Sequence, residues 1–130
     1  MRKPLPPDDP VEWLNRAKSS LALARQQSSE IYPEDLCFQA QQAAEKAIKA
    51  IFISKHLVFP YIHDLLQLMA VLEKSGTPIP QNIKATAKLS LYAALTRYPG
   101  IGDPVSEKEY LEALALAERV VTWAEKKLGK

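Results

Sequence analysis

The chain has 130 residues, enough for one domain that buries roughly two-thirds of its unfolded surface in a single core. Its 17 basic and 15 acidic residues leave a formal charge of +2, which excludes a large field of one sign that would attract nucleic acid unaided. The single cysteine excludes an internal disulfide, and no run approaches the ~18 apolar residues of a membrane span. Because the N-terminus also lacks the apolar core of a secretory signal, we expect a soluble, cytoplasmic protein that does not enter a membrane.

The first residues are rich in proline and show no apolar period. We therefore expect residues 1–8 to form a flexible lead-in and residues 9–130 to form a single domain. Asp9 followed by Pro10 predicts the start of a helix, which should run to about Ser28. The inner stripe of this helix is predicted to be Trp13, Ala17, Leu21 and Ala24.

A second helix is predicted from Pro33 to about Lys55, with acidic residues in its first turn. Small side chains along one face would let a neighbouring helix approach closely; they are Ala40, Ala44, Ala47 and Ile51. Next to this face runs a second stripe, polar in the middle and aromatic at both ends, formed by Phe38, Gln42, Glu45, Lys49 and Phe52.

Three more helices are expected, over residues 65–76, 80–96 and 106–128, the last opened by a capping box at Ser106. The predicted core positions of the two long ones are Ile83, Ala87, Leu91 and Leu95, and then Tyr110, Leu114, Ala117, Val121, Ala124 and Leu128. No alternating strand pattern occurs. The predicted fold is therefore all-α, an antiparallel up-and-down bundle of four long helices and one short helix.

Polar side chains interrupt the second helix, at Gln41, Gln42, Glu45, Lys46 and Lys49. One interpretation is a solvated face, on which Glu45 and Lys49 stand four residues apart in the order that favours a weak surface pair. The other is that Gln42, Glu45 and Lys49 line an internal cleft or subunit seam and meet a ligand or partner there. Both interpretations stay open at this point.

The stretch after the fourth helix raises the same choice for Arg97 and Tyr98. A cation at a helix C-terminus complements the unpaired carbonyls, but Arg97 is also placed to meet a phosphate. His63 is a second candidate for chemistry, although a bond to a neighbouring backbone group would make it structural. Cys37, His56 and His63 lack the spacing of a transition-metal site, so neither a metal nor a cofactor is expected.

Four segments, taken in order, point to one family: "CFQAQQAAEKAIKAIFI", "FPYIHDLLQLM", "LYAALTRYPG" and "ALALAERVVTW". Together they resemble the HEPN domain, the nucleotide-binding helical domain shared by higher eukaryotes and prokaryotes, over about Val11 to Leu128. The resemblance implies a helical bundle that often forms homodimers. For small stand-alone members it also implies a separately encoded minimal nucleotidyltransferase as partner, in pairs many of which act as toxin and antitoxin.

Other members of this family are metal-independent ribonucleases, whose signature is an arginine followed four to six residues later by a histidine. The resemblance would place that arginine at Arg97, but positions 101–104 hold Ile101, Gly102, Asp103 and Pro104. The signature histidine is missing, which argues against this activity because a histidine is the usual proton carrier near neutral pH.

Three functions follow from these observations. The first is a non-catalytic or weakly catalytic nucleotide- or RNA-binding module that works as a homodimer with the nucleotidyltransferase; its ligand-binding residues would be Gln42, Glu45, Lys49, Arg97 and Tyr98. The second is a ribonuclease toxin in which His63 acts with Arg97. The third is a purely structural dimer, joined along the small-residue stripe of the second helix or the apolar stripe of the last one.

Overall fold

The computed structural model describes residues 1–95 and 104–129, and every regular element among them is a helix. The elements are α1 (Pro10–Ala24), α2 (Pro33–Ser54), α3 (Leu65–Lys74), α4 (Gln81–Lys84), the 3₁₀ helix η1 (Ala85–Leu91), α5 (Tyr92–Leu95) and α6 (Glu107–Lys127). The predicted fold class, an all-α bundle, is confirmed.

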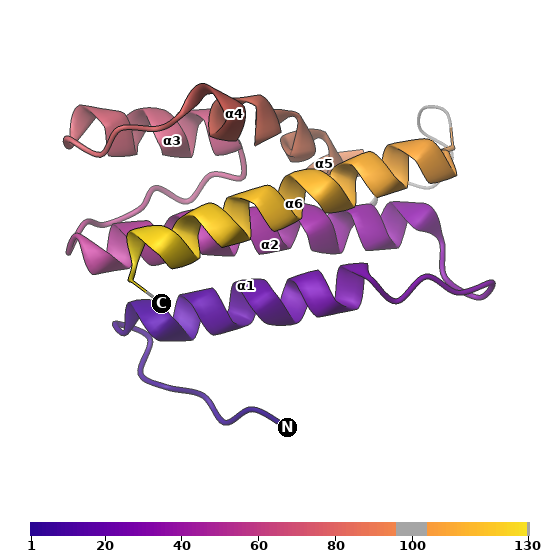
Figure 1. Ribbon diagram of the computed structural model, residues 1–130, viewed down its shortest axis with the longest axis horizontal. Helices are drawn as coiled ribbons and strands as arrows, with labels where there is room; N and C mark the ends of the chain where they lie inside the picture. The colour runs from indigo at the N-terminus through magenta and orange to yellow at the C-terminus, as the bar shows by residue number, and fades with distance from the viewer. Residues whose placement is uncertain (96–103, 130) are drawn as a thin grey trace.

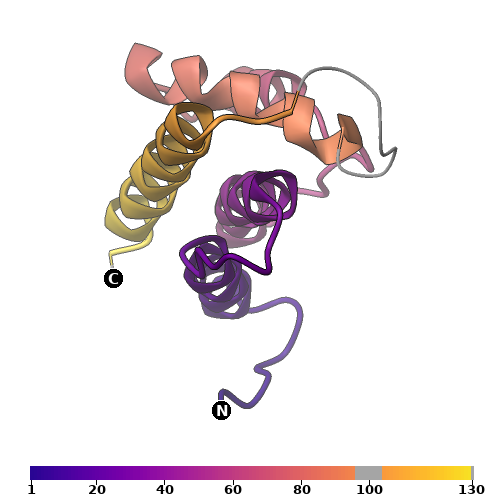
Figure 2. The same ribbon diagram turned by 90° about the vertical axis from the view of Figure 1, so that its right-hand side faces the viewer.

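Helix α2 is the central element of the bundle (Figures 1 and 2). It runs antiparallel to α1, α6 lies along both of them, and α3 to α5 form a layer on the remaining side. A helix surrounded in this way needs small side chains where its neighbours approach closest. This explains why the alanine-rich stripe predicted on α2, from Ala40 to Ile51, is fully buried.

The predicted helix starts are confirmed at both ends of the chain. The Asp9 side chain accepts a hydrogen bond from the amide of Val11 at 2.9 Å, and Pro10 occupies the first position of α1. Ser106 and Glu109 exchange hydrogen bonds at 3.1 Å each, which is the predicted capping box of α6. Helix α1 ends at Ala24, four residues earlier than predicted, because the residues after Arg25 are exposed and have no face to bury.

The prediction of one long α-helix over residues 80–96 is wrong, because residues 85–91 form a 3₁₀ helix. Only the first turn of this segment is α-helical before the chain tightens into η1, and its buried side chains are spaced by three residues, at Ile83, Thr86, Leu89 and Tyr92. Ala87 is only half-buried and Leu91 is 57% exposed, whereas both were predicted to face the core. A 3₁₀ helix has 3.0 residues per turn, so a stripe drawn at four-residue spacing rotates away from the core within two turns.

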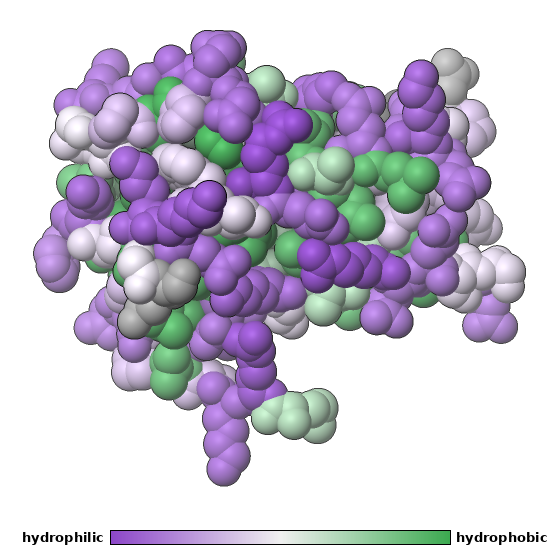
Figure 3. All heavy atoms as spheres, in the orientation of Figure 1, coloured by the Kyte–Doolittle hydropathy of each residue, from purple (hydrophilic) through white to green (hydrophobic). Residues whose placement is uncertain are grey.

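The two apolar stripes offered as dimer seams are both used inside the single chain. On α6, Tyr110, Ala117, Val121 and Ala124 are buried, and the alanines of α2 are buried as well. A dimer therefore has to use a different surface. On the face seen in Figure 3, apolar residues gather over the first half of α6, the part of the helix that carries the half-exposed Leu111. Among the described residues, no helix has the length and apolar character needed to cross a membrane.

Candidate functional site

The end of α2 turns the chain back over the helix itself. The His56 amide donates to the carbonyl of Ile53 at 3.1 Å, and the Leu57 amide donates to that of Phe52 at 3.0 Å, which together form a Schellman motif. This motif needs a left-handed residue, and His56 supplies it with a φ of 56°, a conformation that usually belongs to glycine. The turn directs residues 57–63 back past the last turns of α2.

A buried carboxylate, Glu45, is the centre of the site. Its Oε1 accepts hydrogen bonds from Gln41 Nε2 at 3.0 Å and from His63 Nδ1 at 2.9 Å, while its Oε2 accepts from Lys49 Nζ at 2.9 Å. Gln42 joins through Gln41, whose Oε1 accepts from Gln42 Nε2 at 2.8 Å. The polar residues predicted on α2 are therefore brought together, and His63 is bound to this side chain instead of to a neighbouring backbone group.

The environment of Glu45 decides its charge. Its side chain is only 4% exposed, so burial by itself would raise the pKa. The hydrogen bonds from Lys49, His63 and Gln41, together with the Lys49 charge, outweigh that effect and lower the pKa of Glu45 below its usual value. The interpretation of this stripe as a solvated face is thus wrong for Glu45 and for the fully buried Gln41. Because an ionised carboxylate only accepts hydrogen bonds, the proton of this contact sits on His63 Nδ1.

Aromatic rings from the returning loop close one side of the site. Lys49 Nζ lies 4.8 Å from the centre of the Phe59 ring, within the range of a cation–π contact. Phe59 makes edge-on contacts with Trp13 at 5.2 Å, with Phe52 at 6.1 Å and with Tyr61 at 6.4 Å. Tyr61 is 96% exposed, so a flat ring stands in solvent beside the charged groups.

Lys46 provides a second cation on the same face of α2. Its Nζ donates to the Ser20 hydroxyl of α1 at 2.9 Å. Burial lowers the pKa of Lys46, and the positive charges of Arg16 and Lys49 add to that effect against the opposing charge of Glu45. Among residues 1–95 and 104–129 no carboxylate forms an ion pair with Lys46. The sequence held a signal for it, because position 46 is four residues from Gln42 and three from Lys49 on one helix face.

The other predicted ligand-binding residues, Arg97 and Tyr98, lie outside the described residues. After them, the Val105 amide donates to the Glu34 carboxylate at 2.9 Å, in the first turn of α2. Glu34 precedes Glu45 by eleven residues, a distance of about 16 Å along a helix axis at 1.5 Å per residue. The chain therefore resumes beside the first turn of α2, whereas His63 lies beside the middle of that helix.

Cys37 and the two histidines were the possible metal ligands. Cys37 is fully buried, and burial raises the pKa of its thiol to about 12, against a smaller opposing effect of its hydrogen bond with Tyr92. The thiol is thus protonated near neutral pH and is a poor ligand or nucleophile. In the described part of the chain, no three His, Cys, Asp or Glu side chains come together in an arrangement that would hold a metal ion.

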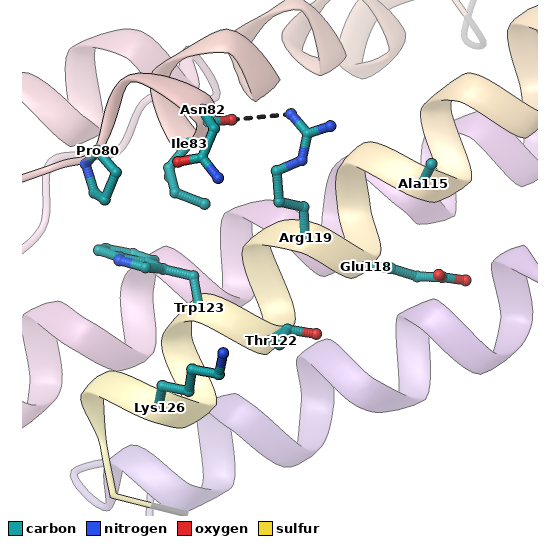
Figure 4. Close-up of a pocket in the computed structure, with 9 residues that line it drawn as sticks. All are labelled: Pro80, Asn82, Ile83, Ala115, Glu118, Arg119, Thr122, Trp123 and Lys126. Carbon is teal, nitrogen blue, oxygen red and sulfur yellow. Dashed lines mark hydrogen bonds between the residues drawn. The ribbon is translucent and has the colours of Figure 1, made fainter.

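A separate groove of about 460 Å³ lies between α4 and α6 (Figure 4). The Arg119 guanidinium crosses it and donates from Nη1 to the Asn82 carbonyl at 3.1 Å, while the Trp123 ring lies on the side of Pro80. Sequence reasoning missed this groove, because Asn82 and Arg119 are 37 residues apart and no local pattern connects them. The hydrogen bond gives Arg119 a structural role, holding α6 to the start of the 81–95 segment.

Comparisons with known proteins agree with this architecture. The model of the HEPN domain family matches residues 11–127. A protein of known structure from Thermus thermophilus is similar at 31% identity and a TM-score of 0.82, covering 92% of this chain and 98% of its own. An archaeal HEPN homologue is similar at 26% identity and a TM-score of 0.72, with 98% of each chain covered. A HEPN domain protein from Thermotoga maritima shares the fold at 24% identity and a TM-score of 0.70, over 91% of this chain and 98% of its own. No curated protein sequence matches the chain.

Proposed function

The chain belongs to the HEPN domain family, and we propose that it serves there as a nucleotide- or RNA-binding module. The observation that carries the proposal is the half-buried pair of cations on α2. Lys49 is held by Glu45, but Lys46 has a hydroxyl as its hydrogen-bond partner and two other cations, Arg16 and Lys49, nearby. An anionic group placed here would relieve the repulsion among these charges, and a phosphate supplies such a group.

The exposed Tyr61 ring supports a nucleotide in preference to a simple anion. Bases stack on aromatic side chains with little sequence preference, and such contacts contribute about 1–3 kcal/mol per base. Tyr61 stands next to Phe59, which in turn covers Lys49, so a stacking surface and a phosphate-binding cation are neighbours. Gln42, also on this face, offers an amide for hydrogen bonds to a base or a ribose.

Titration calorimetry with ATP and with short single-stranded RNA tests this proposal. We expect the wild-type chain to bind one or both, and Lys46→Ala to abolish most of that binding without changing the melting temperature greatly. Lys74→Ala, which removes an exposed cation from the last turn of α3, is the matched control and should leave binding unchanged. Absence of binding by the wild-type chain to both probes would contradict the proposal.

We further propose that the module acts as a homodimer with a separately encoded minimal nucleotidyltransferase, in an arrangement of the toxin-antitoxin kind. The family resemblance supports the partner, and the apolar residues exposed over the first half of α6 (Figure 3) support self-association there. Co-expression with the product of a neighbouring nucleotidyltransferase gene, followed by light scattering on the purified material, tests both points. Leu111→Glu should convert a dimer to a monomer. A monomeric wild-type chain would contradict the homodimer, and a failure of the two proteins to co-purify would contradict the nucleotidyltransferase partner.

A ribonuclease is the second candidate, and the Glu45–His63 contact is what favours it. A carboxylate bonded to Nδ1 fixes the tautomer and orientation of an imidazole whose other nitrogen then acts as a base, and His63 is 56% exposed. Incubation with structured RNA in chelator should then give cleavage that His63→Ala and Arg97→Ala abolish. His56→Gly, which removes the other histidine but keeps a residue suited to the left-handed turn, is the control. Cleavage that survives both of the first substitutions would exclude these residues as catalysts.

A further inference from the structure

We propose that residues 1–8 are a nucleic-acid-binding arm which extends the cationic site of α2, so that the ligand is an RNA strand and not a mononucleotide. This inference rests on the proposed function and deepens it. In the structure, two side chains of the first turn of α1 are hydrogen-bonded to the backbone of this lead-in.

The first tether is Glu12, which reaches past the helix start. Its Oε1 accepts a hydrogen bond from the Leu5 amide at 3.1 Å, and its Oε2 accepts from Arg16 Nε at 2.6 Å. The second tether is Trp13, whose Nε1 donates to the Pro7 carbonyl at 2.8 Å. The indole ring that makes this bond also rests against Phe59, so the lead-in and the aromatic side of the α2 site share one residue.

The tethers place the charged end of the lead-in beside α1. A hollow of about 150 Å³ is lined by Arg2, Lys3, Pro4, Glu12, Asn15, Arg16 and Ser19, and its carboxylate, Glu12, is paired with Arg16. No carboxylate within the described ranges forms an ion pair with Arg2 or Lys3, and the Arg16 side chain is more than half exposed despite its bond to Glu12. The hollow thus offers cations and polar groups to an anion in solvent.

This hollow lies next to the α2 site, with α1 between them. Ser19 lines the hollow, and the next residue, Ser20, accepts the hydrogen bond of Lys46. Arg16 lies close enough to Lys46 to lower its pKa, and Lys46 is followed on the same helix face by Lys49. Five cations, Arg2, Lys3, Arg16, Lys46 and Lys49, accompany two carboxylates, Glu12 and Glu45, which pair with Arg16 and Lys49. Asp8, at the end of the arm, is the one acidic residue among residues 1–8.

The length of this row selects the ligand. From Glu12 to Ser20, α1 rises by about 12 Å at 1.5 Å per residue. Because α2 is antiparallel to α1, Lys49 lies beside this row, back toward Trp13, and widens it near Phe59. A mononucleotide carries its phosphates at one end and neutralises one part of such a row. An RNA strand carries a charge at every nucleotide, so its phosphates can pair with cations along the whole row while its bases reach the exposed Tyr61 ring.

Fluorescence anisotropy with a labelled 12-nucleotide single-stranded RNA, measured over a range of salt concentrations beside ATP titrations, tests the arm. In the full chain, Arg2→Ala with Lys3→Ala should weaken RNA binding and make the slope of log affinity against log salt shallower by about 1.4, at about 0.7 per lost phosphate contact. ATP affinity should not change. Lys74→Ala with Lys108→Ala removes the same charge from exposed positions of α3 and α6. This control should change neither RNA binding with its salt dependence nor ATP affinity.

Trp13→Phe separates positioning from charge, because it keeps an aromatic ring against Phe59 but removes the donor to Pro7. We expect it to weaken RNA binding and to leave ATP binding and the melting temperature unchanged. If Trp13→Phe lowers the melting temperature, Leu5→Pro serves instead, because it removes the amide that donates to Glu12 and changes no charge. An arm variant that behaves like the Lys74 and Lys108 control overturns the inference. ATP binding without RNA binding by the wild type overturns it too but leaves the proposed function standing, whereas binding of neither removes both.

Discussion

Two segments that look alike in sequence, α2 and residues 81–95, bury their side chains in different ways. Both are rich in alanine and both show apolar residues at helical spacing. In α2 that spacing holds over 22 residues, and the predicted stripe from Ala40 to Ile51 is the buried one. In residues 81–95 the buried positions come every three residues and the predicted Leu91 faces solvent. Apolar spacing thus predicts orientation only where the neighbouring helices let the α-helical geometry persist.

The two segments also use charged residues differently. On α2 the carboxylate of Glu45 is buried among three donors. Its ion-pair partner Lys49 has a side chain that is only 12% exposed. On η1, Lys88 pairs with Glu112 of α6 at the surface, where both side chains are at least half exposed. Pairs of the same chemical type should therefore differ strongly in their effect on stability, since solvent screens the second but not the first.

The largest effect expected is the loss of the α2 carboxylate. Glu45→Ala leaves Lys49 without its carboxylate and the buried Gln41 without its acceptor, so the free energy of unfolding should fall by about 3–5 kcal/mol. Glu112→Ala breaks the exposed pair and should change stability little. Urea denaturation of both variants measures the contrast, and equal losses would mean that the α2 pair is not buried in solution.

The register of the 81–95 segment can be tested with two leucines of the same helix. Leu89 is fully buried and Leu91 is 57% exposed, so Leu89→Ala should cost about 2–5 kcal/mol and Leu91→Ala no more than about 0.5 kcal/mol. Thermal or urea unfolding provides the measurement. A larger loss for Leu91→Ala would restore the four-residue spacing of a regular α-helix and contradict the 3₁₀ geometry.

The pH dependence of stability should report on Glu45 in particular. Because its pKa is lower in the folded chain than the usual 4.5, its contribution is fully present above that value and is lost as the pH falls through the folded pKa. Unfolding of the wild type and Glu45→Gln from neutral to acidic pH should show a stability difference that is largest above about pH 4.5 and shrinks below it. A difference that grows on acidification would mean that the folded pKa is raised.

The smallest predicted effect concerns the contact between the 81–95 segment and α3. Ser90 Oγ accepts a hydrogen bond from the Leu65 amide at 2.9 Å, at the first residue of α3, and Leu65 is fully buried. Ser90→Ala leaves this amide without its partner and should lower the free energy of unfolding by about 1 kcal/mol. Ser75→Ala, at the exposed end of α3, is the comparison and should cost less. Equal effects would place the Ser90 bond in solvent.

Much of the candidate site on α2 follows from the sequence. Gln42, Glu45 and Lys49 are predicted to share one face because residues three and four apart are neighbours on any α-helix, and the structure brings them together. What the sequence does not contain is the partner of that face. His63 reaches Glu45 from 18 residues away and Phe59 covers Lys49, both because a Schellman turn at His56 reverses the chain.

The sequence by itself determined the helical class, the starts of α1 and α6 and the buried faces of α2 and α6, since caps and apolar spacing act over a few residues. The tertiary structure alone decided that Glu45 is buried and ionised, that η1 has three residues per turn and that the lead-in is tethered at Leu5 and Pro7. These features depend on contacts between distant segments, where packing and desolvation outweigh local preference.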